Sequence, residues 1–187
     1  MKEVRNNSLE LRLSPESRLV EGYALVFNSE SNDLGGFVEV IDRSALDGVL
    51  EKSDVLCLLN HNENKGVLAR WNKGKGSLVL EVDDKGLRYL FEAPKTALGD
   101  ELLEGLRRGD ISTSSFAFTC GKDKWEKRSD GTYLRTITSI DELFDVSPVY
   151  KPAYSATSVN TRGLDQLKAQ EQIELDNYYK ELREQLK

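Results

Sequence analysis

Residues 109 to 121 read GDISTSSFAFTCG, a run of four hydroxyl-bearing residues followed by two phenylalanines that are separated by one alanine. Successive side chains of a strand point to opposite faces, so Phe116 and Phe118 predict a strand with one face in the core. The same alternation places Ser114 with the phenylalanines and Ser115 on the opposite face, among small neighbours. This strand either carries a hydroxyl-rich solvent face or displays a nucleophile with an exposed hydroxyl. In the second case the nucleophile is Ser115.

The segments on both sides of this strand predict a mainly β fold. From residue 9 to about 93, short alternating runs are separated by Gly, Asn, Asp and Ser, and two further runs lie at 133–140 and 143–149. This spacing is typical of a β-barrel or sandwich. A helix is predicted over 96–110, because its leucines form one stripe and Gly109 can end it. The expected class is therefore α+β, mainly β with flanking helices.

The chain of 187 residues is long enough for one domain and some spare length. After residue 161 the composition changes to Glu, Gln, Lys and Leu, with leucines at roughly helical spacing. We therefore expect a domain over 1–161 and a charged amphipathic helical tail over 162–187. The tail is either a solvated helix or a segment that docks the protein to a partner.

Composition excludes several kinds of protein and site. The formal net charge of −6 argues against a protein that binds nucleic acid. The two cysteines, Cys57 and Cys120, lie in apolar runs and are expected to be buried thiols in a reducing compartment, although a disulfide remains open. Two cysteines and one histidine cannot build a four-ligand Cys/His zinc site, while metals bound by oxygen remain open. No segment approaches the ~20 apolar residues of a membrane span, so we expect a cytoplasmic protein without cofactor or metal.

The only histidine, His61, decides which serine chemistry the sequence can support. An imidazole has an ordinary pKa of about 6.5, so it can take a proton from a serine at neutral pH and return it to a leaving group. His61 follows the apolar run DVLCLL and lies at a predicted strand end, where a side chain can be held rigidly. The alternative interpretation is an ordinary polar residue of the surface or core.

A third group must orient such an imidazole and stabilise its charged form. In DELFDVSPV (141–149), alternation places Phe144 and Val146 inward and Leu143, Asp145 and Ser147 on the other face. Asp145 is therefore an acid within an otherwise apolar strand, where a charge is rarely found without a partner. A surface salt bridge is the alternative role for Asp145.

Taken in order, five segments resemble the prohead (capsid maturation) serine proteases of tailed phages, distant relatives of the herpesvirus assemblin proteases. The resemblance covers residues 18 to 160 and rests on EGYALVFNSESNDLGGFVEVIDRSAL, LLNHN with VLARW, DDKGLRYLFEAP, GDELLEGLRRGDISTSSFAF and LFDVSPVYKPAYSATSV.

The resemblance implies a closed or partly open β-barrel of the herpesvirus-protease type. It also implies that His61 is the base, that Ser115 is the nucleophile and that Asp145 holds the imidazole. The phage proteases often have Glu at the acidic position and Gly where this chain has Ala117. The shorter side chain of Asp145 shortens the reach to His61, and Ala117 affects how closely another backbone can approach the nucleophile. The segment CGKDKWEKRSDG (120–131) is a candidate loop for oxyanion donors.

By this resemblance the substrate is the major capsid protein precursor or a scaffold protein, and the protease chain itself. Cleavage is implied to take place inside the assembling prohead, in the cytoplasm of the bacterial host, and activity can depend on a homodimer or on assembly. The predicted tail would dock the protease to the precursor and is a candidate for removal by cleavage. Two alternatives stay open: an inactive barrel that binds scaffold as an assembly factor, and a hydrolase of small esters.

Overall fold

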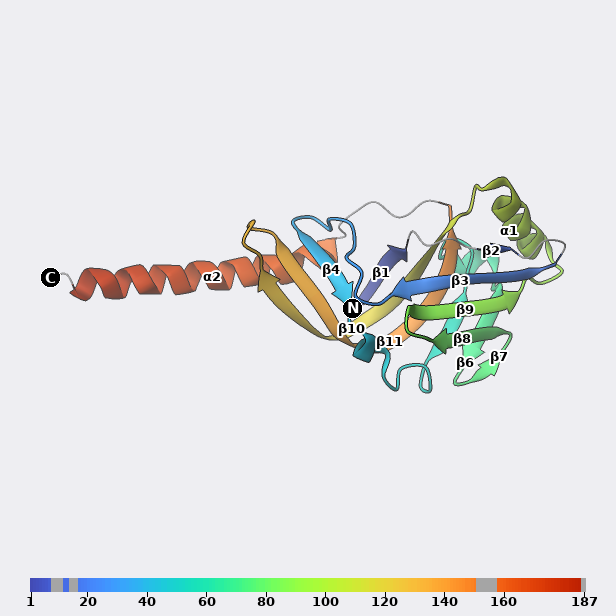
Figure 1. Cartoon of the computed structure of the whole chain (residues 1–187), viewed down its shortest axis with the longest axis horizontal. Helices are drawn as coiled ribbons and strands as arrows, with labels where there is room; N and C mark the ends of the chain where they lie inside the picture. Colours follow the sequence, from blue (N-terminus) through green and yellow to red (C-terminus); the bar gives the residue numbers. More distant parts are fainter. Residues whose placement is uncertain (8–11, 14–16, 151–157, 186–187) are drawn as a thin grey trace.

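Two β-sheets and two α-helices make up the part of the chain described by the computed structural model, which comprises residues 1–7, 12–13, 17–150 and 158–185 (Figure 1). Two short 3-10 helices lie at Arg43–Leu46 and Glu63–Lys65, and the α-helices are α1 (Ala97–Arg108) and α2 (Ser158–Gln185). The strands are β1 (Lys2–Asn7), β2 (Arg12–Leu13), β3 (Leu19–Val26), β4 (Phe37–Ile41), β5 (Asp54–Cys57), β6 (Ala69–Asn72), β7 (Lys75–Gly76), β8 (Leu78–Val82), β9 (Gly86–Glu92), β10 (Thr113–Lys127) and β11 (Tyr133–Val149).

The larger sheet has the strand order β1-β10-β11-β5-β6-β7, and β4 also pairs with β11. The smaller sheet has the order β2-β3-β9-β8. One hydrophobic core joins side chains of both sheets, among them Val20, Phe91, Phe116 and Val146. The prediction of a mainly β protein with a C-terminal helix is confirmed. Closure into a barrel is not, because the described strands at the ends of each sheet, such as β1 and β7, do not pair with each other.

The long hairpin of β10 and β11 forms the centre of the larger sheet (Figure 1). Strand β10 lies between β1 and β11, antiparallel to both. The first part of β11 runs parallel to β4, and Asp145 and Val146 near its end pair in parallel with β5. The end of β5 therefore lies beside the part of β11 that carries Asp145.

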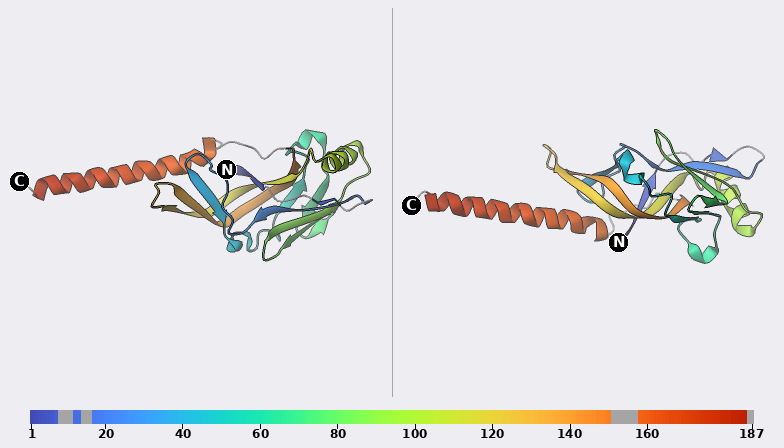
Figure 2. Two further views of the ribbon diagram at one scale, coloured as in Figure 1. Left: turned by 45° about the horizontal axis from the view of Figure 1, so that its top comes forward. Right: turned by 90° about the horizontal axis from the view of Figure 1, so that it is seen from below.

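The helices differ in how they are stabilised. The Thr96 side chain caps α1 by accepting a hydrogen bond from the Gly99 N–H, and Gly109 ends it with a left-handed φ of 77°, as predicted. The predicted helical tail is also confirmed, although α2 begins at Ser158. Leu164 of α2 packs against the sheet, and most of the helix then extends away from the strands (Figures 1 and 2). None of the helices described has the length and apolarity that a membrane crossing requires.

Candidate active site

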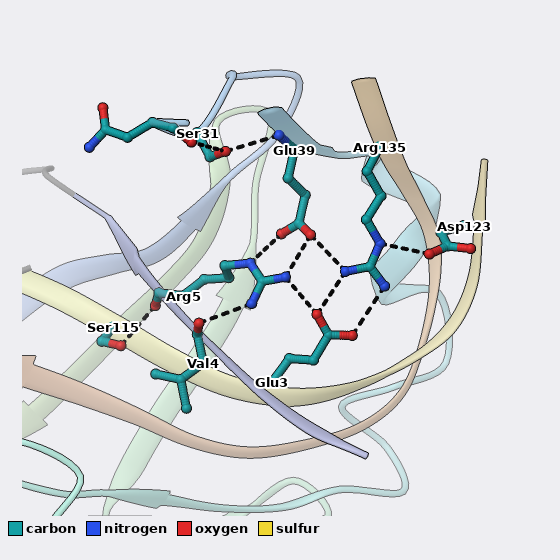
Figure 3. Close-up of polar contacts among 9 residues, drawn as sticks. Glu3, Val4, Arg5, Ser31, Glu39, Ser115, Asp123 and Arg135 are labelled. Carbon is teal, nitrogen blue, oxygen red and sulfur yellow. Dashed lines mark hydrogen bonds and ion pairs between the residues drawn. The ribbon is translucent and has the colours of Figure 1, made fainter. Parts of the chain in front are cut away.

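Strand β10 places its side chains as the alternation predicted, with one exception. Phe116 and Phe118 lie in the core with stacked rings 5.2 Å apart, and Ser114 on the same face shares a 2.8 Å hydrogen bond with the Tyr89 hydroxyl. Ser115 lies on the opposite face. Its predicted exposure is wrong: Ser115 is fully buried, and its hydroxyl lies 2.8 Å from the carbonyl oxygen of Arg5 on the neighbouring strand β1 (Figure 3).

The turn after β5 brings His61 to Ser115. Asn60 and His61 both have left-handed backbone conformations, with φ of 55° and 56°, which residues other than glycine adopt rarely. The turn is held by the Asn60 N–H, which donates a 2.9 Å hydrogen bond to the Pro148 carbonyl at the end of β11. The predicted position of His61 beyond a strand end is confirmed, and β11 itself fixes the turn.

A β-bulge in β11 sets the direction of Asp145. Ala117 pairs with Asp145, whereas the next residue, Phe118, pairs with Leu143, so that Phe144 is the extra residue of the bulge. Leu143 consequently lies in the core with Phe118, and Asp145 faces the side of the sheet that carries Ser115. The predicted alternation was therefore wrong for Leu143 and Phe144, because a bulge interrupts the two-residue period.

The structure brings together the three side chains that the sequence singled out. His61 Nε2 lies 2.6 Å from Ser115 Oγ, and His61 Nδ1 lies 2.5 Å from Asp145 Oδ1. The Ser147 hydroxyl donates a 2.7 Å hydrogen bond to the same Asp145 oxygen. The substitution of the shorter Asp for the Glu common at this position thus leaves direct contact with His61. The imidazole retains 23% exposure and is the part of this cluster that is open to solvent.

Charge around Asp145 keeps this buried carboxyl ionised. Burial by itself raises the pKa of Asp145, but the hydrogen bond and charge of His61, the Ser147 hydroxyl and the charge of Lys2 outweigh it and lower the pKa below its ordinary value. Lys2 Nζ lies 3.4 Å from Asp145 Oδ2, a buried oxygen that has no hydrogen-bond partner among the described residues. Asp145 is therefore suited to stabilise a positive charge on His61.

The cysteines offer no competing nucleophile at this site. Both are free thiols, so the disulfide that the sequence left open is not formed. Burial raises the pKa of the Cys57 thiol well above its ordinary value, and the nearby Asp145 charge raises it further. Burial likewise raises the pKa of Cys120 to about 11. A thiol that stays protonated is a poor nucleophile, so neither cysteine competes with Ser115 as a candidate.

Three residues of the site had no assigned role in the sequence analysis. Ser147 was placed on the face of Asp145, and its position two residues further along the strand is the signal that could have assigned it to the carboxylate. Lys2 and Arg5 of β1 gave no such signal, because their contacts with Asp145 and Ser115 span more than a hundred residues. Residues 120–127, offered as part of an oxyanion loop, instead belong to strand β10.

Comparisons with known proteins show the family of this chain. A search of curated proteins gives no significant match. Among solved structures, the capsid assembly protease gp21 of bacteriophage T4 is similar, with 10% sequence identity and a TM-score of 0.46 over 81% of this chain and 98% of that chain. The sequence model of the caudovirus prohead serine proteases matches residues 3–171. Because this match covers most of the chain, the protein belongs to the caudovirus prohead serine protease family.

Proposed function

We propose that this protein is a serine endopeptidase that cleaves capsid-precursor or scaffold chains during prohead maturation. Family membership supports the reaction class and the setting, which is the assembling prohead in the host cytoplasm. The observation that carries the proposal is the connected series Ser115, His61 and Asp145, with contacts of 2.6 and 2.5 Å. These distances lie within the hydrogen-bond reach that nucleophilic catalysis by serine requires.

The proposed reaction is acyl transfer in two halves. His61 Nε2 takes the hydroxyl proton of Ser115 while Oγ attacks the carbonyl carbon of the peptide bond, whose π electrons move onto the oxygen. The imidazolium then gives this proton to the departing amine nitrogen, the C–N bond breaks, and an acyl ester remains on Ser115. His61 next takes a proton from a water molecule, whose oxygen attacks the ester carbon. The imidazolium then gives this proton to Ser115 Oγ as the ester C–O bond breaks, which releases the carboxylic acid product.

Asp145 and Ser147 act through the imidazole. Asp145 accepts the Nδ1–H, which leaves the Nε2 lone pair directed at Ser115 and balances the positive charge that forms on His61. The Ser147 hydroxyl fixes the orientation of that carboxylate through its 2.7 Å bond. Ser147 is thus a positioning residue that does not itself contact substrate.

The proposal is tested by co-expressing the chain with its major capsid precursor and measuring the masses of both proteins. Discrete truncation of the precursor with wild type, and none with Ser115→Ala, is the expected result. Two matched controls lie within three residues of Ser115: Ser114→Ala on β10, whose hydroxyl bonds to Tyr89, and Ser112→Ala at an exposed position just before the strand. Both are expected to retain cleavage.

Other outcomes identify the alternatives. Unchanged masses with wild type and with Ser115→Ala, while capsids still assemble, would contradict the protease and favour an assembly factor. Turnover of small activated esters without cleavage of the precursor would favour an esterase. Truncation that persists in Ser115→Ala would move the nucleophile elsewhere or assign the cut to another protease.

A further inference from the structure

Three separate segments of the chain carry the three groups of the candidate site. Ser115 lies on β10, His61 on the turn after β5, and Asp145 on β11. The distances from His61 to the other two groups therefore depend on how these segments are held relative to one another. A misplacement of about 1 Å can slow a reaction by about a hundredfold. Contacts that join the three segments outside the site are thus candidates for a role in the reaction.

The chain that leaves His61 has no buried side chain in its next turn. The 3-10 helix Glu63–Lys65 is exposed throughout. His61 itself has a left-handed backbone, which persists in a residue other than glycine only where the surroundings hold it. Among the described residues, one ion pair joins this 3-10 helix to another element: Lys65 Nζ lies 2.7 Å from Glu101 Oε1 on α1.

The same oxygen of Glu101 binds the chain that leaves Asp145. The Tyr150 hydroxyl donates a 2.8 Å hydrogen bond to Glu101 Oε1. Tyr150 directly follows the last residue of β11. One carboxylate oxygen thus connects the segment after the proposed base with the segment after the proposed acid. We refer to Lys65, Glu101 and Tyr150 as the Glu101 clamp.

The helix that carries Glu101 is also fixed to the strand that carries Ser115. A short connection, residues 109–112, joins α1 to β10. Within it, the Ile111 N–H donates a 3.1 Å hydrogen bond to the Gly105 carbonyl of α1. The buried Ile111 side chain packs so closely that a Cβ at position 105 would lie 2.6 Å from its Cδ1. The clamp is therefore anchored next to the start of the nucleophile's strand.

The clamp is ionic and open to solvent. The side chains of Lys65 and Glu101 each retain 43% exposure. Hydrogen bonds from Lys65 and Tyr150 lower the pKa of the Glu101 carboxyl below its ordinary value, so it stays ionised at neutral pH. An exposed ion pair contributes little to the free energy of unfolding. Removal of Glu101 should therefore leave the fold intact, so that its effect on the site can be measured separately.

We propose that Glu101 is a positioning residue of the candidate site. Through Lys65 and Tyr150 it holds the segments that leave the base and the acid, and its own helix leads into the strand of the nucleophile. The inference rests on the proposed function, because it concerns the arrangement of that same site.

The first test observes the imidazole directly by NMR. His61 is the only histidine of the chain, so every imidazole resonance belongs to it. The Nδ1–H that is hydrogen-bonded to Asp145 gives a proton resonance far downfield, and its width reports how fast this proton exchanges with water. Glu101→Ala is expected to speed this exchange about three- to fivefold, which is the effect of losing one well-formed exposed ion pair.

A matched control for this variant lies on the same helix. Glu104 is also an exposed carboxylate of α1, but its ion pair is with Arg107, one turn further along the helix. Glu104→Ala should therefore leave the exchange of the imidazole proton unchanged. Thermal melts of both variants are expected to match that of the wild type, because neither removes a buried contact.

The second test measures the kinetics of precursor cleavage. Glu101→Ala is expected to lower kcat about three- to fivefold with KM unchanged, because the clamp acts on the reacting groups and not on the substrate. Tyr150→Phe keeps the ion pair and should lose less. Lys65→Glu and Glu101→Lys each bring two like charges together and should lower kcat further. The double variant restores an ion pair of reversed direction and should recover most of the rate.

The outcomes separate the inference from the proposed function. Equal exchange and equal kcat in wild type, Glu101→Ala and Glu104→Ala would overturn the positioning role and leave the protease standing. A charge-reversed double variant as slow as its two single variants would also overturn it. Faster exchange and lower kcat in Glu101→Ala, with recovery in the double variant, would support the inference.

Failure of the proposed function has a different signature. Wild-type protein that cleaves no precursor would overturn the protease, and the exchange measurement would still decide whether Glu101 holds the imidazole. Absence of the downfield resonance from folded wild-type protein would show that His61 is not bound to Asp145 and would overturn both.

Discussion

Leu143 and Asp145 are two positions apart in one strand, yet they lie on opposite faces of the sheet. The bulge at Phe144 separates them, so that Leu143 packs opposite Phe118 while Asp145 pairs with Ala117 and faces His61. A regular strand would place both side chains on one face. The candidate site therefore depends on an irregularity of the strand as much as on the residues themselves.

Asp145→Asn is expected to lower the rate of precursor cleavage by about 10³- to 10⁴-fold, because an amide neither balances a charge on His61 nor fixes its tautomer. Cleavage is followed by the mass of the precursor over time. The matched control is Asp123→Asn on β10, which removes a carboxylate outside the site. A loss of less than tenfold in Asp145→Asn would show that the carboxylate does not act on the imidazole.

Ser147→Ala should have a smaller effect, since it removes one hydrogen bond to Asp145 and leaves the contact between Asp145 and His61. A hydrogen bond to a charged group corresponds to a loss of about tenfold in rate. We expect this loss in the maximal rate, with the KM for precursor unchanged, because Ser147 does not reach the substrate. A change confined to KM would contradict the positioning role.

The turn that carries His61 provides a third prediction. Asn60 has a φ of 55°, a conformation that glycine and asparagine accept and that a β-branched residue accepts only with strain. Asn60→Val is therefore expected to destabilise the protein by about 1–2 kcal/mol. It should also slow the reaction of Ser115 with a fluorophosphonate probe. Asn60→Gly should keep the stability of the wild type and its rate of reaction with the probe. Thermal melts and probe labelling of the two variants measure the effects, and equal behaviour of Val and Gly would exclude strain in this turn.

The second buried serine of β10 is expected to be structural. Ser114→Ala and Tyr89→Phe each leave one buried hydroxyl without its 2.8 Å partner and should each cost about 1 kcal/mol of unfolding free energy. The double variant should cost less than the sum, because both hydroxyls are then absent. Urea unfolding measures all three. Additive losses would mean that the two hydroxyls are not paired in solution.

Acid should destabilise the protein through its buried carboxylates. Burial by itself raises the pKa of Glu3, but hydrogen bonds and charge from Arg135 and Arg5 outweigh it and lower the pKa below the ordinary value of 4.5. The pKa of Asp145 is lowered as well. Carboxylates with a lowered pKa in the folded state stabilise it above their unfolded pKa, and this contribution is lost as pH falls through the folded value.

The free energy of unfolding is therefore expected to fall as pH drops below about 5. Urea titrations between neutral and acidic pH measure this slope. Glu3→Gln should flatten it, because one of the titrating groups is removed, while Glu51→Gln at an exposed position should not. A slope that is the same in wild type and Glu3→Gln would contradict the ion pairs of Glu3 with Arg5 and Arg135.

Local sequence patterns predicted the parts of the site that depend on neighbouring residues. Alternation assigned Phe116 and Phe118 to the core and Ser115 to the other face, and the end of an apolar run placed His61 beyond a strand. Alternation also singled out Asp145 but failed for Leu143, since a bulge has no signature in a two-residue period. The burial of Ser115 could not be predicted, because the groups against its hydroxyl, Arg5 and His61, lie far from it in the sequence. Barrel closure likewise depends on long-range pairing.

The order of the strands has a consequence for biosynthesis. Strand β1 is translated before β10 and β11, yet it pairs with β10, and its ion pairs reach β4 and β11. The contacts of Ser115 with Arg5 and of His61 with Asp145 span 110 and 84 residues, so neither can form until most of the domain has left the ribosome. Contacts of such long range form late and slowly in folding. Ser115 and Asp145 both come from these last strands, so the cluster of Ser115, His61 and Asp145 is completed only after nearly all of the described strands have been synthesised.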